Sequence, residues 1–414
     1  MRIPALVSRT VIILAPLSHA QTVLDRQCWH EHPLSTVNVQ SGIEPGVEIV
    51  SKVPRSKDSD GKDYAPWSHE PRCTHVIESI NEELCIYTSA SFSNGRGISI
   101  FTTPSLAAQF ASLPAFTDQS ALAKQNINVR TGAWRAESIP SKGVGMLATR
   151  SLKFKDRITA YTPAFLAYLE SELGTLEREK WWRLAIEQLP QQTKKDFLEL
   201  ATVYGDERVR VQDIVKANTF QVMVGDGNHL AVFPETSRLN HACNSNAQYV
   251  IDTDMLSHTV HATRPIAEGE EITISYTSPL DPLSTRQQNL QSGFHFTCTC
   301  SRCTSPESDN TLAQIGSIQA ELNDWSETSL GSPETAELLL RIYRDEGLEG
   351  FMDVPYGFAA LAYNAAGDDV GAIKYAKKAK EAVLMKDGRW SANLRIWEEL
   401  LADVKGHWSW RRRV

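Results

Sequence analysis

The feature that most constrains this chain is a set of four cysteines in its second half. The run FTCTCSRC contains Cys298, Cys300 and Cys303, and Cys243 is the only other cysteine beyond residue 100. Three thiolates are one short of the tetrahedral shell that zinc takes in structural sites. Disulfides are the competing use, but Cys298 and Cys300 are too close in sequence to bridge easily. The spacing therefore predicts a structural Zn²⁺ site that ties the segment near residue 300 to the loop at Cys243.

The loop around Cys243 is rich in polar side chains. It reads RLNHACNSNAQY and places Asn240 and His241 next to the cysteine. If zinc holds the later segment over this loop, the sequence GFHF, with Phe294 and Phe296, forms an aromatic roof above polar groups. Such a pocket suits a purine ring with a charged or zwitterionic tail. For an Asn–His pair taken alone, structural hydrogen bonding is the favoured alternative.

Two further motifs are weak when taken singly. KGVGMLATR places Lys142, Gly143 and Gly145 in a turn before a strand, and glycines there allow a ligand to approach the backbone. GEEITISY ends a predicted strand at Tyr276. A tyrosine at the end of a strand is usually a core or interface residue. Neither KGVGMLATR nor GEEITISY therefore identifies a functional site when taken alone.

Hydrophobic periodicity divides the chain into β-rich and α-rich blocks. β-branched and aromatic residues predict strands over 73–103 and again from residue 129, and helical spacing follows over 164–218. Five strand-like segments then return over 220–276. Because strands on either side of the helices should pair with one another, the sequence predicts an α+β fold with a helical insert.

The last hundred residues are predicted to be helical. Within them, Tyr356 to Leu384 has the spacing of a helix-turn-helix repeat of the tetratricopeptide kind. Small residues at Ala360, Ala372 and Ala379 would let two helices approach closely. An ordinary helical hairpin is the alternative.

The N-terminus has the order of a signal peptide. Residues 1–20 combine two arginines, a short apolar run and a small-x-small site. The run is too short to span a bilayer, and an untidy N-terminus of a cytosolic protein is the alternative. In an oxidising compartment, Cys73 and Cys85 could form a disulfide, with Cys28 spare or joining instead.

Charge narrows the choice of partner. The formal net charge is −8 over 414 residues, and bulk nucleic-acid binding depends on basic surfaces that release counterions. We therefore expect no direct nucleic-acid partner and no membrane span, and a basic peptide suits this chain better.

Together, KGVGMLATRSLKFKDRI, RLNHACNSN, GEEITISY and FTCTCSRC resemble the SET-domain protein lysine methyltransferases, in the order and roughly at the spacing of that family. The resemblance is greatest to the SET and MYND subfamily and to related fungal SET-domain proteins. It implies a β-rich SET domain with a helical insert, a post-SET zinc segment and an all-α, tetratricopeptide-like C-terminal region. The implied divisions begin with a signal peptide at 1–20 and a region of unknown role at 21–130. The SET domain follows at 131–280, with its helical insert at about 164–218. The post-SET segment is 281–306 and the helical domain is 307–414.

The resemblance also implies roles for individual residues. Tyr276 would be the catalytic tyrosine, and Phe296 would pack on the adenine of S-adenosylmethionine. The other implied cofactor-binding residues are Lys142, Gly143, Gly145, Asn240, His241 and Tyr276 itself. Zinc would be bound by Cys243, Cys298, Cys300 and Cys303. The sequence departs from the family where Ser245 replaces a proline, although Asn246 is kept, and it has no cysteine cluster for a MYND finger.

These roles predict a protein-lysine N-methyltransferase that uses S-adenosylmethionine. Its substrate would be a lysine of a protein or peptide, with a histone tail as one candidate. Lysine has a pKa near ~10.4, so a narrow apolar channel would be needed to favour the neutral amine. The alternative is a non-catalytic SET-fold scaffold that binds partners through its helical C-terminal domain. The expected location is the secretory pathway if the signal peptide is used, and the nucleus or cytoplasm otherwise.

Overall fold

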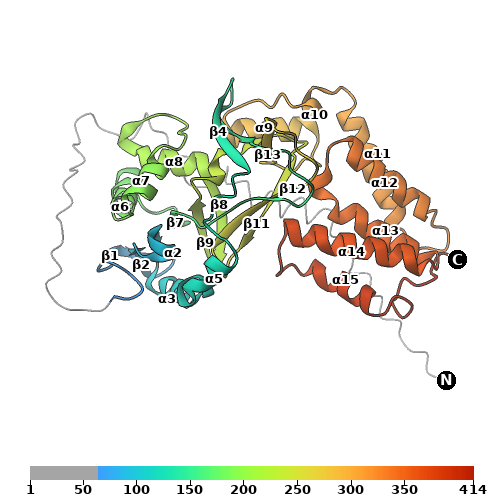
Figure 1. The fold of residues 1–414 in the computed structure, drawn as a ribbon, viewed down its shortest axis with the longest axis horizontal. Helices are drawn as coiled ribbons and strands as arrows, with labels where there is room; N and C mark the ends of the chain where they lie inside the picture. Colours follow the sequence, from blue (N-terminus) through green and yellow to red (C-terminus); the bar gives the residue numbers. More distant parts are fainter. Residues whose placement is uncertain (1–63) are drawn as a thin grey trace.

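The computed structural model describes residues 64–414, which form three parts along one long axis (Figure 1). A sheet with its helices, coloured blue to green, lies at one end, and an all-helical region, orange to red, lies at the other. The strands that carry the candidate site lie between them. The predicted α+β fold with an all-helical C-terminal region is confirmed.

The first sheet joins segments that lie far apart in the sequence. Its six strands run in the order β1-β2-β3-β7-β9-β8. β3 and β7 are parallel, and the other neighbours are antiparallel. Residues before and after position 130 therefore share this sheet. The strands are β1 (Arg72–Ile77), β2 (Glu82–Ser89), β3 (Ile98–Thr102), β7 (Phe165–Tyr168), β9 (Gly227–Val232) and β8 (Thr219–Val224). The helices of this part before residue 130 are α2 (Phe92–Gly95), α3 (Pro104–Ser112), α4 (Pro114–Thr117) and α5 (Gln119–Lys124).

Two smaller sheets carry the central motifs. One has the order β10-β13-β5-β4 and the other the order β11-β12-β6. All five strands predicted over 220–276 are present. The four-stranded sheet contains β10 (Asn240–His241), β13 (Glu271–Ile274), β5 (Gly143–Ala148) and β4 (Trp134–Ile139). The three-stranded sheet contains β11 (Ala247–Asp252), β12 (Ser257–Ala262) and β6 (Arg157–Tyr161).

The helical insert is shorter than the sequence predicts. Phe165–Tyr168 is strand β7, which pairs with β3 and β9, and helix begins only at Thr175. A short apolar run does not distinguish a strand from a helix, and here pairing with two neighbours decides for the strand. The helices that follow are α6 (Thr175–Glu187), α7 (Gln191–Leu198) and α8 (Arg210–Asn218).

The insert packs on the first sheet through aromatic side chains. The Phe165 ring lies 5.6 Å from that of Trp182 and 6.1 Å from that of Phe197, measured between centroids. All three side chains are buried. Burying a phenylalanine contributes about 1.5–3 kcal/mol, so this contact holds the helices against β7.

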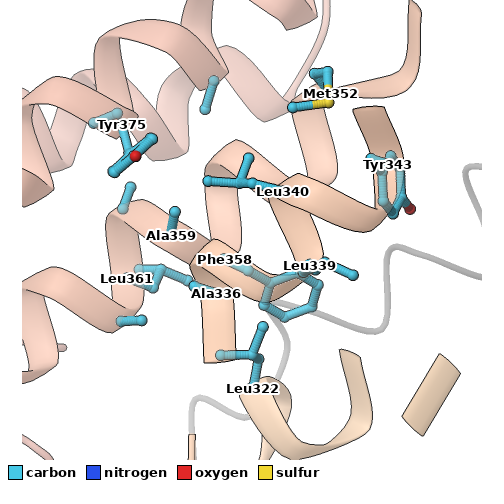
Figure 2. Close-up of a cluster of buried hydrophobic side chains, with 14 of the residues drawn as sticks. Leu322, Ala336, Leu339, Leu340, Tyr343, Met352, Phe358, Ala359, Leu361 and Tyr375 are labelled. Atoms are coloured by element: carbon cyan, nitrogen blue, oxygen red, sulfur yellow. The ribbon is translucent and has the colours of Figure 1, made fainter. Parts of the chain in front are cut away.

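The C-terminal region has its own hydrophobic core. Its helices are α11 (Ser308–Asn323), α12 (Pro333–Asp345), α13 (Asp353–Ala365), α14 (Asp369–Lys386) and α15 (Asn393–Ala402). Figure 2 shows Leu339, Leu340 and Phe358 at the centre of this core, with Leu322 beneath them. Ala360, Ala372 and Ala379 are fully buried. The helical hairpin α13–α14 is therefore present, and its tetratricopeptide character stays a prediction.

Ion pairs join the helical region to the rest of the chain. Those that cross the junction are Arg302 with Glu346 at 2.8 Å, Arg389 with Asp254 at 2.7 Å, and Lys155 with Glu381. Arg302 and Glu346 are largely buried, whereas the Arg389 and Lys155 pairs are partly exposed and contribute little singly. They do show that α14 and the loop after it face the three-stranded sheet.

Cys73 and Cys85 form a disulfide across the antiparallel pair β1–β2, where they stand directly opposite each other. Cys28 and the signal-peptide prediction for residues 1–20 lie outside the described residues. Within residues 64–414, we find no helix with the length and apolar character needed to cross a membrane.

Candidate active site

The structure brings the four cysteines of the second half together. The sulfur atoms of Cys243, Cys298, Cys300 and Cys303 all lie within 4.8 Å of one another. Tetrahedral zinc with Zn–S bonds of about 2.3 Å would place them roughly 3.8 Å apart. The Cys243 and Cys303 sulfurs are 3.4 Å apart. We refer to this group as the cysteine cluster, and its spacing fits a four-thiolate metal site.

Local structure around the cysteine cluster explains how it forms. Helix α9 (Leu283–Phe294) ends at His295, whose φ of 60° turns the chain out of the helix. The short helix α10 (Ser301–Thr304) then begins after Cys300, whose carbonyl accepts a hydrogen bond from the Cys303 N–H at 2.9 Å. Turn and helix together point the last three thiols back toward Cys243.

Hydrogen bonds among the four thiols favour the thiolate at Cys300, whereas the pKa values of Cys243 and Cys298 lie above the ordinary value. Hydrogen bonds from the other thiols, with that of Cys243 the largest contributor, hold the pKa of Cys300 below its ordinary value. A fully buried arginine, Arg286, places its guanidinium 3.9 Å from the Cys303 sulfur and also donates to the Asp281 carbonyl at 2.6 Å. Thiolates, not thiols, are the metal ligands, so these contacts prepare the cluster for a cation.

Parallel pairing of β10 with β13 positions the Asn–His pair. It sets Asn240 opposite Thr273 and His241 opposite Ile274. The buried His241 ring accepts a hydrogen bond from the Tyr276 N–H at 3.0 Å through Nδ1, and its Nε2 lies 3.3 Å from the Cys243 sulfur. Burial lowers the pKa of His241 to about 3. This neutral ring therefore links the cysteine cluster to the predicted catalytic tyrosine.

A glutamate that the sequence analysis missed connects the predicted cofactor residues. Glu271 on β13 accepts from the Asn240 side-chain amide at 2.9 Å and pairs with the Lys142 ammonium at 2.7 Å. A Cβ added at Gly145 would lie 2.7 Å from the Asn240 amide nitrogen. Gly143 instead has φ of +75° with open space around it. Gly145 thus leaves room beside Asn240, whereas Gly143 is needed for the turn.

Tyr276 lies beyond the end of β13 with its hydroxyl inside the protein. The hydroxyl donates to the Leu239 carbonyl at 2.5 Å. Its ring centroid is 4.7 Å from that of Phe294 and 6.4 Å from that of Phe296. Burial, with a smaller effect of the Glu271 charge, raises the pKa of Tyr276 above its usual range. The phenol therefore stays neutral at physiological pH.

A small cavity of about 40 Å³ lies beside Tyr276, enough for a few water molecules. Its walls include four aromatic or aliphatic side chains besides that of Tyr276, from residues Phe220, Leu239, Tyr249 and Phe294. Phe220 and Tyr249 come from β8 and β11, two strands on different sheets. Phe220 stands in no motif, and Tyr249 only ends the loop sequence RLNHACNSNAQY, so no local signal predicted their place in this wall.

Comparison with known proteins agrees with this arrangement. Residues 143–277 match the SET domain family. The chain is 26% identical over 268 residues to the histone-lysine N-methyltransferase set5 of Schizosaccharomyces pombe, which covers 62% of this chain and 80% of that protein. It is 31% identical over 103 residues to the human N-lysine methyltransferase SMYD2, and 31% identical over 97 residues to a SET and MYND domain-containing protein of Dictyostelium discoideum.

The SET and MYND matches are short. They span 23% of the human protein and 18% of the Dictyostelium protein, about a quarter of this chain in each case. Among solved structures, the SET domain of LSMT bound to lysine and AdoHcy matches with a TM-score of 0.29 at 14% identity, over 75% of this chain and 96% of that one. Residues 143–277 thus match the SET domain family, and the relatives include the N-lysine methyltransferase SMYD2 and the histone-lysine N-methyltransferase set5.

Proposed function

We propose that this protein is an S-adenosylmethionine-dependent protein-lysine N-methyltransferase. The observation that carries the proposal is the buried Tyr276 hydroxyl at a narrow cavity walled by aromatic rings, beside the group formed by Lys142, Asn240 and Glu271. Two relatives, set5 and human SMYD2, are named as lysine methyltransferases, which supports the same function.

The residues present fit S-adenosylmethionine. Its methionine end carries an ammonium and a carboxylate, and Glu271 and Lys142 offer the two opposite charges on one side of Asn240. The half-buried Phe296, 5.9 Å from His241 between ring centroids, offers an aromatic face for the adenine. When bound, the cofactor would supply an electrophilic methyl group on a sulfonium.

The cavity walls prepare the substrate amine. The wall combines the rings of Phe220, Tyr249 and Phe294 with polar residues such as Asn218 and Ser275. Burial of the amine there would lower the lysine pKa from about 10.4 toward neutrality. Tyr276 is not the base, because its raised pKa keeps its proton on the phenol and that proton is donated to Leu239. Its oxygen lone pairs remain to accept a hydrogen bond from the amine and orient it. Such positioning can contribute about 7–11 kcal/mol in favourable cases.

The cysteine cluster fits structural zinc. Four thiolates complete a tetrahedral shell and leave no open position for catalysis. Its role would be to hold the segment with Phe294 and Phe296 against His241 and Tyr276. The metal would therefore support the cofactor pocket without taking part in methyl transfer.

The test is transfer of labelled methyl groups from S-adenosylmethionine to a mixture of cell proteins that includes histones. Tyr276→Phe keeps the ring but removes the hydroxyl, and we expect a loss on the order of 100-fold. Tyr87→Phe, at a buried tyrosine packed on Trp67 in the first sheet, is the matched control and should keep full activity. Equal rates for Tyr276→Phe and the wild type would contradict the assigned role.

Calorimetry separates the enzyme from the scaffold alternative. The wild-type protein should bind S-adenosylmethionine, and Tyr276→Phe should retain most of that affinity because the hydroxyl is assigned to the amine. Absence of binding to wild-type protein would favour the scaffold.

The identity of the substrate protein, with a histone as one candidate, and the cellular compartment stay predictions. The Cys73–Cys85 disulfide supports an oxidising compartment.

A further inference from the structure

A second, larger cavity lies at the junction between the SET domain and the helical region. Its volume is about 330 Å³, within the range of small-molecule sites, which often form at domain interfaces. We call it the junction cavity. On the SET side it is lined by Phe154, Gln248, Thr263, Arg264 and Pro265, and on the helical side chiefly by Arg344, Glu349, Met352, Tyr356, Lys378 and Met385. It shares no residue with the cavity at Tyr276.

The two sides of the junction cavity meet closely. A Cβ added at Gly350 would lie 3.5 Å from the Thr263 methyl carbon and 3.8 Å from the Gln248 Cβ. The space beside Gly350 is therefore just wide enough for one methyl group, so the two regions approach closely at this point. The cavity is formed by packing of the two regions and is not a gap between separated domains.

Two buried polar atoms in the wall have no hydrogen-bond partner among residues 64–414. They are the Thr263 hydroxyl oxygen and Oε2 of Glu349, and Thr263 is only 4% exposed. Leaving such groups unpaired costs about 1–3 kcal/mol each. Burial also raises the pKa of Glu349 above its ordinary value. Neither atom is open to the cavity, so what a bound ligand can meet there is the charge of the Glu349 carboxylate.

Cations also line the cavity, and Arg264 and Arg344 lie close enough to Glu349 to act against the rise in its pKa. Arg344 and Lys378 line the same cavity, and the Lys378 ammonium lies 5.3 Å from the Tyr356 ring centroid. Arg264 is already paired with Glu270 at 2.9 Å. A simple cation would be repelled by these groups, and a simple anion would meet Glu349. The rest of the wall includes Met352, Met385 and two aromatic rings together with the polar Gln248.

From this layout we infer that the junction cavity binds a small zwitterion of the α-amino-acid type, up to the size of a short peptide. Its ammonium would pair with Glu349, its carboxylate would face Arg344 and Lys378, and its side chain would lie on the methionines. The inference does not depend on methyltransferase activity.

The test uses three probes of similar length with the full chain. Norleucine has both charges and a linear apolar side chain, pentylamine has only the ammonium, and hexanoate has only the carboxylate. Calorimetry should detect norleucine binding, with each half-ligand at least about tenfold weaker. No heat with norleucine, or equal affinity for either half-ligand, would overturn the proposal.

Variants locate the binding. Glu349→Gln should weaken norleucine binding by about tenfold or more, because the charge-assisted contact is lost. Glu381→Gln is the matched control, since Glu381 lines the same cavity but already pairs with Lys155. Gly145→Val alters the predicted cofactor pocket and should leave norleucine affinity unchanged. Norleucine binding that survives Glu349→Gln but disappears in Gly145→Val would place it at the cofactor pocket and refute the junction site.

Discussion

Substitution of His258 by phenylalanine should make this protein more resistant to acid. His258 on β12 is fully buried, and neither ring nitrogen has a hydrogen-bond partner within the part of the chain that the structure describes. Three aromatic rings surround it. The His258 ring centroid lies 4.4 Å from that of Phe220, 4.5 Å from that of Tyr249 and 5.2 Å from that of Phe233. Burial lowers the pKa of His258 to about 3. The folded protein therefore keeps this ring neutral.

The sign of the effect follows from proton binding in the two states. The unfolded chain protonates this histidine below pH ~6.5, whereas the folded protein resists protonation until about pH 3. The unfolded state thus binds more protons as the pH falls, so His258 lowers the free energy of unfolding across that window. Between pH 8 and pH 5 the loss from this residue alone is about 2 kcal/mol, from ~1.36 kcal/mol per pH unit over roughly 1.5 units.

Urea unfolding followed by circular dichroism at pH 8, 6 and 5 measures this directly. His258→Phe keeps an aromatic ring of similar shape, and its stability relative to wild type should rise by about 2 kcal/mol from pH 8 to pH 5. Other histidines are common to both proteins and cancel. His75→Gln, at a side chain 66% exposed, is the control and should show no such trend. Parallel curves for wild type and His258→Phe would refute the reasoning.

Three further predictions follow from the same structure. Gly145→Val would crowd the Asn240 amide, so calorimetry should show at least about tenfold weaker S-adenosylmethionine binding with the fold retained by circular dichroism. The purified protein should contain one zinc per chain by elemental analysis, and its removal by a chelator should lower the melting temperature and abolish methyl transfer, whereas an unchanged melting temperature would contradict a structural role. Lys386 pairs with Asp353 at 2.6 Å with both side chains 5% exposed, so Lys386→Met should cost about 3–5 kcal/mol in urea unfolding, and adding Asp353→Leu should recover part of that loss.

Much of the candidate site could be read from local sequence because its residues occur in motifs. The cysteine spacing predicted that Cys243 would meet the later three cysteines, and the structure brings their sulfurs together. Alternation of apolar residues predicted the strands on both sides of the helical insert. These predictions were possible because the spacing of metal ligands and the periodicity of a strand can be read within short stretches of sequence.

Other features depended on pairing between distant segments. Phe165–Tyr168 was predicted as helix, and its place between β3 and β9 makes it a strand. Glu271 links Lys142 to Asn240 only because β13 pairs with both β10 and β5. No sequence pattern predicts the contact of Glu271 with Lys142 and Asn240.

Motif spacing and hydrophobic periodicity were enough to predict the SET resemblance, the four candidate zinc ligands, the α+β fold and the helical C-terminal region. The aromatic walls at Tyr276, the unpaired nitrogens of His258 and the junction cavity with Glu349 became visible only in the folded chain. The physical reason is that burial, desolvation and charge balance at a residue are set by all the segments packed around it. Here those segments come from different sheets and from the C-terminal helices.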